Sequence, residues 1–128
     1  MNYDLYSQQI LELWRNPINK GEIKNPTYSS NSNNPLCGDK LELFIKTKKT
    51  GRQTVIVQAK FNGEGCAISQ ASASLLTTHI IGLNISELKN IDTNLVRKLL
   101  GVPISANREK CAFLILDALE RCKISNFQ

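Results

Sequence analysis

The sequence predicts an α+β fold, a small antiparallel β-sheet with helices packed on one face. Three observations lead to this prediction. The segment "LELFIKTK" (41–48) alternates apolar and polar residues, and "QTVIVQAKF" (53–61) is rich in β-branched residues. Residues 49–52 between them read as a turn, so the two segments form a hairpin. Helical periodicity precedes and follows this hairpin, and a small sheet needs such helices to cover its apolar face.

The first predicted element is a helix over 3–15, whose apolar residues recur at spacings of one, three and four. It ends at Asn16-Pro17. The segment 16–34 that follows is rich in Asn, Ser, Pro and Gly, and we expect a long, mobile polar loop. Beyond the hairpin, the glycines of "NGEG" (62–65) are expected to end the second strand.

Three helices are predicted after the hairpin. The first, 67–82, has small residues on one side that permit close packing. The second, 92–101, ends at a glycine, and a Ser-x-Glu turn signal precedes it. The third, 105–122, is expected to be one continuous helix. No internal repeat is present, so we expect residues 1–128 to form a single domain.

Composition narrows the class of protein. Hydrophobic residues make up 41% and charged residues 21% of the chain, which is ordinary for a globular domain. No stretch approaches the apolar length of a membrane span, and the N-terminus does not have the order of a secretory signal, so we expect a cytoplasmic protein without a membrane role. The net charge is +5, but the lysines are dispersed and aromatics are only 6%. Nucleic-acid binding is therefore not expected. The excess of positive charge is explained equally well by an acidic protein partner or by a role in keeping the protein soluble.

Four cysteines carry the candidate chemistry. In a reducing cytoplasm, metal binding or catalysis is the expected use of cysteines rather than disulfides. Cys37 lies in a loop before the first predicted strand, Cys66 where a strand passes into a helix, and Cys111 near the start of the last helix. Cysteines at the ends of strands and helices can converge on one edge of a small domain. A helix N-terminus also favours the thiolate form of a cysteine, which zinc binding and sulfur chemistry require. The wide spacing matches no zinc-finger pattern, so scattered core cysteines are the alternative.

Three further residues have two interpretations each. Asp39 is either a metal ligand or a turn residue at the strand entry. His79, the single histidine, lies in an apolar helical segment and is expected to be a surface or core residue rather than a ligand. Cys122 lies about 16 Å further along the last helix than Cys111. It cannot share a metal ion with Cys111, and we expect a buried or terminal free thiol.

Several motifs together resemble the IscU/SufU family, which includes the N-terminal domain of NifU. The segments "NPLCGD" (34–39), "FNGEGCAISQASASLL" (61–76) and "REKCAFLILDAL" (108–119) resemble the three cysteine motifs of that family. The opening "YSQQILELWRNPINKG" (6–21) resembles its first helix and the following Asn-Pro-x-Asn-x-Gly loop. The resemblance covers nearly the whole chain. It implies a compact α+β domain that works in iron–sulfur cluster assembly.

The resemblance also implies a site made of Cys37, Asp39, Cys66 and Cys111. In the family, the three cysteines accept sulfur as a persulfide from a cysteine desulfurase, which is the implied partner. In scaffold members the cysteines then hold a nascent [2Fe–2S] cluster. In SufU-type members they bind zinc together with the aspartate, and the protein relays sulfur onward. A downstream apo-protein or cluster carrier is the second implied partner.

The resemblance implies different sulfur acceptors for the two kinds of member. For a scaffold we expect the acceptor to be Cys111, and for a zinc relay Cys37. Three thiolates and one carboxylate around a dication leave a negative charge, which helix N-termini and the side chains of Arg108 or Lys110 could offset.

Two departures from the family pattern point in opposite directions. IscU-type members carry a histidine directly before the third cysteine and a Leu-Pro-Pro-Val-Lys-type chaperone motif nearby. Here that position is Lys110, and "GVPISANREK" (101–110) has no such motif, which favours SufU. SufU-type members, however, generally carry an insertion between the second and third cysteines that is missing here. Scaffold and zinc relay both stay open, as does classification as a sulfurtransferase. The alternative from another class is a zinc-stabilised adaptor or regulator that binds the desulfurase without transferring sulfur.

Overall fold

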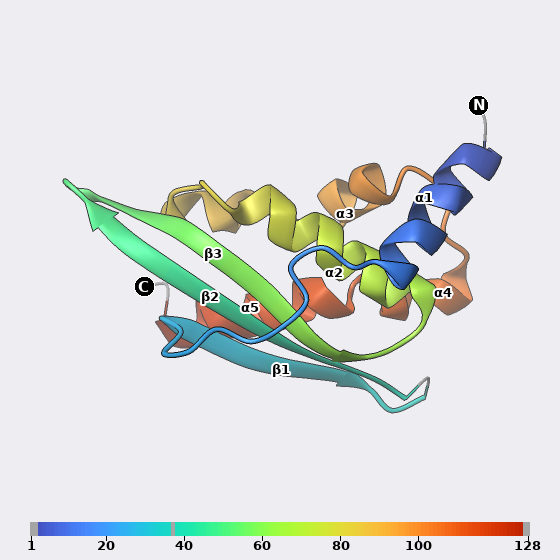
Figure 1. Cartoon of the computed structure of the whole chain (residues 1–128), viewed down its shortest axis with the longest axis horizontal. Coiled ribbons are helices and arrows are strands. Elements are labelled where there is room, and N and C mark those ends of the chain that lie inside the picture. The colour runs from blue at the N-terminus through green and yellow to red at the C-terminus, as the bar shows by residue number, and fades with distance from the viewer. Residues whose placement is uncertain (1–2, 37, 127–128) are drawn as a thin grey trace.

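The computed structural model describes residues 3–36 and 38–126 and confirms the predicted α+β class. Figure 1 shows a twisted three-stranded antiparallel sheet, in the order β1-β2-β3, with helices packed against it. In chain order the elements are α1 (Tyr3–Arg15), β1 (Tyr28–Asn34), β2 (Asp39–Thr50), β3 (Gln53–Glu64), α2 (Ala67–Ile80), the 3-10 helix η1 (Ile85–Asn90), α3 (Thr93–Leu100), α4 (Ala106–Ala112) and α5 (Leu114–Asn126).

The β2–β3 hairpin confirms the predicted alternation. Leu43 pairs with Phe61 and Ile45 with Ala59, and all four side chains are buried on the same face. Because successive side chains of a strand point to opposite faces, the residues between them, Phe44 and Lys60, lie on the other face, where Phe44 interrupts the otherwise regular alternation. Gly51, at φ 65°, allows the tight turn that closes the hairpin. The hairpin therefore has one apolar face for the helices to cover.

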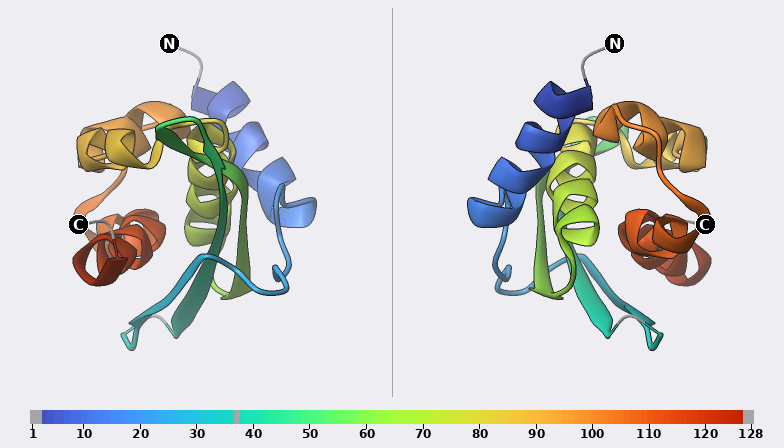
Figure 2. Two further views of the ribbon diagram at one scale, coloured as in Figure 1. Left: turned by 90° about the vertical axis from the view of Figure 1, so that its left-hand side faces the viewer. Right: turned by 90° about the vertical axis from the view of Figure 1, so that its right-hand side faces the viewer.

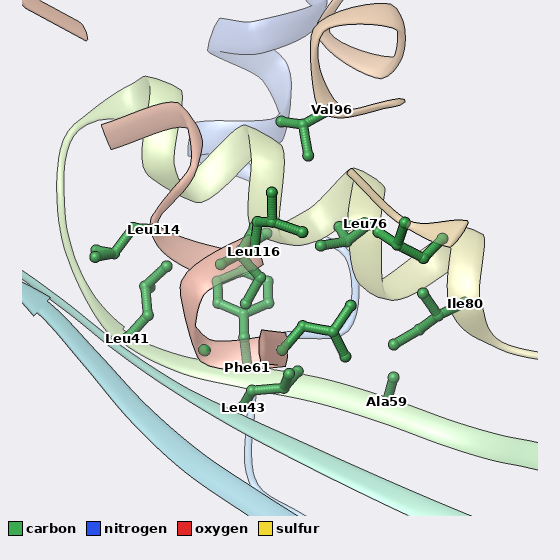
Figure 3. Close-up of a cluster of buried hydrophobic side chains, with 14 of the residues drawn as sticks. Leu41, Leu43, Ala59, Phe61, Leu76, Ile80, Val96, Leu114 and Leu116 are labelled. Carbon is green, nitrogen blue, oxygen red and sulfur yellow. The ribbon is translucent and has the colours of Figure 1, made fainter. Parts of the chain in front are cut away.

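One apolar core joins this face to the helices. Figure 3 shows buried side chains from β2, β3, α2, α3 and α5 that point toward one another. Those labelled there are at most 7% exposed: Leu41, Leu43, Ala59, Phe61, Leu76, Ile80, Val96, Leu114 and Leu116. Each large side chain so buried stabilises the fold by about 1.5–3 kcal/mol. Helix α2 packs on β3 and α5 on β1 and β2, side by side (Figure 2).

The prediction of a loop over 16–34 is wrong for residues 28–34, which form β1. Its sequence "YSSNSNN" has no apolar alternation, so no strand signal is visible. The strand forms because α5 supplies polar partners for its inward side chains. The Ser30 hydroxyl donates to the carbonyl of Ala118, and the Ser32 hydroxyl donates to the carboxylate of Asp117. Buried hydroxyls that are paired in this way cost little free energy.

The remainder of that segment, residues 16–27, is anchored rather than loose. The Asn19 side-chain amide donates to the hydroxyl of Thr77 at 3.2 Å, and the Lys20 ammonium donates to the Gln70 side chain at 2.9 Å. Its backbone also bridges to β3. The segment therefore fastens α1 and β1 to the rest of the fold.

Strand β3 ends within "NGEG" as predicted, at Glu64 before Gly65, but it passes through the first glycine of the motif, Gly63. Gly63 has φ 123°, and a Cβ atom there would lie 2.0 Å from the carbonyl oxygen of Lys40 on β2. The missing side chain thus lets the two strands approach closely, so here glycine sustains the pairing instead of breaking it.

The helix predicted over 105–122 is two helices, α4 and α5, separated at Phe113. The break lets α4 pack on α2 while α5 lies on the sheet. Arg97 of α3 holds the junction: it forms an ion pair with Glu109 at 3.0 Å, and its guanidinium lies 4.9 Å from the centre of the Phe113 ring. Both halves keep helical periodicity, so a one-residue break is invisible in the apolar pattern. Within the described part of the chain, no helix combines the length and apolarity needed to cross a membrane.

The bond between Ser32 and Asp117 makes stability depend on pH. Burial of the Asp117 carboxyl raises its pKa. Hydrogen bonds from Ser32 and Arg121, together with the charge of Arg121, lower the pKa by more than burial raises it, so the net pKa lies below the ordinary 3.8. Since the folded pKa is lowered, the ionised carboxylate stabilises the fold above pH 3.8. That contribution is lost as the pH falls through the lowered value.

We expect Ser32→Ala to lower the free energy of unfolding by about 1 kcal/mol at neutral pH, because a charge-assisted hydrogen bond is lost. The loss should shrink as the pH falls below 3.8 and through the lowered pKa of folded Asp117, where its carboxylate takes up a proton. Urea denaturation at several pH values measures both effects. Ser29→Ala, at an exposed position of the same strand, is the control. An equal loss in both variants would contradict the account.

Candidate metal centre

Three elements bring Asp39, Cys66 and Cys111 together at one end of the molecule. Asp39 is the first residue of β2, Cys66 is the N-cap of α2, and Cys111 lies in α4. One carboxylate oxygen and the two Sγ atoms all lie within 4.8 Å of one another. The start of β2, the first turn of α2 and α4 share the right-hand side of Figure 1. The predicted fourth residue, Cys37, lies outside the described residues.

The Asp39 carboxylate is buried without a full set of partners. The residue is 2% exposed, and its Oδ1 accepts a hydrogen bond from the backbone N–H of Cys66 at 3.3 Å. Its Oδ2 is buried and accepts no hydrogen bond from the described residues. A buried carboxylate oxygen without a partner is costly. A cation beside Oδ2 removes this cost, so the position fits a metal ligand better than a simple turn residue.

The two sulfurs complete a donor set that suits zinc or iron. Cys66 is half-buried and Cys111 is 2% exposed, and none of the three cysteines that the structure describes is in a disulfide. Thiolates together with one carboxylate are ligands that zinc binds in proteins. A carboxylate and two thiolates at this separation would repel one another, and a dication between them would turn that repulsion into attraction. The residues present therefore fit a metal ion.

Gly65 leaves the space that the carboxylate occupies. A Cβ atom at this position would lie 2.2 Å from the Ser69 hydroxyl oxygen and 3.1 Å from the Asp39 carboxyl carbon. The Ser69 hydroxyl in turn donates to the carbonyl of Cys66 at 3.0 Å. The N-terminus of the 14-residue helix α2 adds a partial positive charge beside the same atoms. Glycine, serine and the helix start thus position the donor atoms.

The segment around position 37 is held by Asn34, which the sequence analysis did not identify. The Asn34 side-chain oxygen accepts a hydrogen bond from the N–H of Leu36 at 3.3 Å, and its backbone carbonyl accepts one from Gly38 at 2.9 Å. An asparagine that bonds the backbone two residues on is a common turn device. The Asn-Pro pair in "NPLCGD" was the available signal for it. Ser69 and Gly65, by contrast, gave no local signal.

The other candidate residues lie away from the cluster. His79 is exposed near the end of α2, about 20 Å along the helix from Cys66, so it is a surface residue as expected. Cys122 is buried, as predicted, and its thiol donates to the hydroxyl of Ser30 at 3.3 Å. Burial raises the pKa of this thiol, and the hydrogen bond lowers the pKa by a smaller amount.

Arg108 and Lys110 are exposed, and neither forms an ion pair within the described residues. Their charges offset little of the negative charge of the cluster.

Comparison with known proteins agrees with the geometry. The profile of the NifU-like N-terminal domain family matches residues 5–128. The zinc-dependent sulfurtransferase SufU of Bacillus subtilis is 37% identical over 91% of this chain and 88% of its own length. The iron–sulfur cluster assembly scaffold protein IscU 1 of Archaeoglobus fulgidus is 30% identical over 97% of this chain and 78% of its own. The predicted resemblance to the IscU/SufU family is confirmed.

A solved structure shares the fold. A protein proposed as the iron–sulfur cluster assembly scaffold of the SUF system in Fervidobacterium islandicum superposes with a TM-score of 0.73 at 29% identity, over 95% of this chain and 98% of that one. The alignment with the Bacillus SufU runs over 134 positions yet includes only 91% of this chain. The SufU relative therefore has additional residues that this chain lacks.

The space at Gly65 generates a prediction for metal affinity. We expect Gly65→Ala to displace the Asp39 carboxylate and the Ser69 hydroxyl, and to weaken Zn²⁺ binding by about 10- to 100-fold, as is typical for residues that support metal ligands. Competition with a chromophoric chelator measures the affinity, and circular dichroism checks the fold.

The double variant Gly65→Ala/Ser69→Ala is the control for this mechanism. It removes the closest clash, that with the Ser69 oxygen, and should recover part of the affinity. An affinity unchanged in the single variant would show that position 65 does not shape the cluster.

Proposed function

The chain belongs to the family of NifU-like N-terminal domains, and from this premise we propose that it is an iron–sulfur cluster assembly protein that accepts sulfur from a cysteine desulfurase. One observation carries the proposal. The buried Oδ2 of Asp39, which accepts no hydrogen bond from the described residues, supports a ligand role, and a carboxylate oxygen of Asp39 lies within 4.8 Å of two thiol sulfurs. The names of the relatives, an iron–sulfur scaffold and a zinc-dependent sulfurtransferase, support the same activity.

In this proposal Cys37, Asp39, Cys66 and Cys111 hold zinc in the resting protein. Bound zinc keeps the thiols deprotonated and hence nucleophilic or ready to be exchanged. The three cysteines are also the ligands for a [2Fe–2S] cluster if the protein works as a scaffold, since thiolates hold iron as well as zinc. The cluster is then cargo that leaves for a downstream apo-protein or cluster carrier.

Exposure supports Cys37 over Cys111 as the sulfur acceptor. Cys111 is 2% exposed, so a partner's persulfide reaches it only after α4 or its neighbours move. The residues on either side of position 37 are exposed, Leu36 at 81%. In the transfer, the Cys37 thiolate attacks the outer sulfur of the donor persulfide. A new sulfur–sulfur bond forms on Cys37, the donor's own sulfur–sulfur bond breaks, and the donor cysteine leaves as a thiolate.

We further propose that residues 1–128 act as one domain in the cytoplasm. The family match over 5–128 supports a single unit. A reducing compartment supports the chemistry, because the acceptor must be a free thiolate rather than part of a disulfide.

A zinc-stabilised adaptor that binds the desulfurase without taking sulfur is the second candidate. The burial of Asp39 and Cys111, each 2% exposed, favours it, because structural zinc sites are closed to outside reactants. The two candidates differ in whether sulfur becomes attached to the chain.

Native mass spectrometry after anaerobic incubation with a cysteine desulfurase, cysteine and ferrous iron separates these functions. We expect a gain of sulfur. If zinc is retained, the protein is a zinc-dependent relay. If two irons and two sulfides replace zinc, it is a scaffold. No gain of sulfur, with desulfurase binding intact, would overturn sulfur transfer in favour of the adaptor.

Cysteine-to-serine variants test the assignment of residues. We expect Cys37→Ser to abolish the gain of sulfur while the chain stays folded, and Cys66→Ser to lose zinc. Cys122→Ser is the matched control and should keep zinc and sulfur transfer, because its buried thiol lies outside the cluster. Loss of transfer in Cys122→Ser equal to that in Cys37→Ser would contradict the assignment.

A further inference from the structure

Positive charge is concentrated in the central part of the β2–β3 hairpin, residues 43–63. Between Glu42 and Glu64 there are five basic residues and no acidic one; the five are Lys46, Lys48, Lys49, Arg52 and Lys60. The chain has 16 basic and 11 acidic residues in all, so the residues outside 43–63 are balanced at 11 of each. The stretch 43–63 alone therefore carries a positive charge equal to the net +5 of the whole chain.

The closed end of the hairpin presents this charge freely. Figure 1 shows it projecting past β1 and beyond the helices. Lys48, Lys49 and Arg52 are exposed there, and we call these three residues the basic tip. Both ion pairs found among the described residues lie on α3, α4 and α5, so none of the three tip cations is paired with a carboxylate there. The Lys46 ammonium, by contrast, donates to the carbonyl of Asn25 at 2.7 Å and steadies the base of the projection.

Protection of a strand edge does not account for the whole pattern. β2 extends beyond β1, whose register ends opposite Ile45, and lysines on such an unpaired edge discourage aggregation. Edge protection explains Lys48 and Lys49, because lysine is the residue most often used for it. It does not explain Arg52, which lies in the turn rather than on the edge.

We propose that the basic tip is a docking surface for an acidic protein surface. Charge complementarity is what such a partner needs, and the tip offers it without competing carboxylates. Proteins that bind single-stranded nucleic acid usually add exposed aromatic rings on which bases stack. The hairpin offers no such ring, since Phe61 is fully buried and Phe44 half-buried on the strands. The pattern therefore favours a protein partner over single-stranded nucleic acid, and a DNA duplex is tested separately.

The position of the tip means that docking leaves the metal cluster open. Asp39 begins the 12-residue strand β2 and the tip lies at its other end, about 37 Å away at the rise of an extended strand. A partner held at the tip thus does not cover the cluster. This surface is independent of the proposed sulfur chemistry, which uses the opposite end of the hairpin.

Poly-L-glutamate is the probe for the test, with fluorescence anisotropy as the readout at physiological ionic strength. The tip variant Lys48→Gln/Lys49→Gln/Arg52→Gln removes three positive charges. The control variant Arg15→Gln/Lys89→Gln/Lys98→Gln removes three exposed cations from helices, so both variants have the same net charge. We expect the tip variant to bind about tenfold more weakly than the unmodified chain, and the control variant to change by less than about twofold.

Three outcomes would overturn the proposal. They are no binding of poly-L-glutamate by the unmodified chain, an equal loss in both variants, and tighter binding of a DNA duplex through the same three residues. The zinc content and sulfur uptake of the tip variant are measured in parallel and should be unchanged. A failure of the docking surface is thereby distinguished from a failure of the sulfur-accepting site.

Discussion

The buried carboxylate of Asp39 is the constraint on which the rest of the site depends. Placing it beside two cysteine sulfurs in the interior costs free energy unless a positive charge compensates it. The surroundings are arranged to permit this placement: Cys66 donates its backbone N–H, and Gly65 has no side chain to occupy the space. The Asp39 carboxylate thus connects three elements: the start of β2, the start of α2, and α4. The same cluster therefore links the fold to the proposed chemistry.

Much of the fold could be predicted from the sequence because most elements bury apolar side chains at regular intervals. The hairpin followed from the alternation around Leu43 and from the turn at Gly51. Strand β1 could not be predicted, because its inward residues after Tyr28 are two serines and an asparagine. The two serines pair with groups on α5 that lie more than 80 residues away in the chain. The break at Phe113 was hidden for a different reason, since helical periodicity continues on both sides of it.

The candidate site was predicted through its motifs rather than through its spacing. The distances between the cysteines along the chain match no metal pattern, and only the resemblance joined Cys37, Asp39, Cys66 and Cys111 into one set. The structure brings the last three together. The supporting roles of Gly65 and Ser69 depend on contacts between a strand and a helix, which no local sequence signal records.

The hairpin joins two surfaces of different chemistry. Its open end carries the donor cluster of Asp39, Cys66 and Cys111, and its closed end carries the basic tip. The length of the two strands keeps these ends apart, so a partner at one end need not displace a partner at the other.

X-ray absorption spectroscopy of the zinc-loaded full-length chain tests the central claim most directly. The account predicts three sulfur ligands at about 2.3 Å and one oxygen ligand at about 2.0–2.2 Å from the zinc ion. Fewer than three sulfur ligands, or the scattering pattern of an imidazole ring from His79, would contradict it.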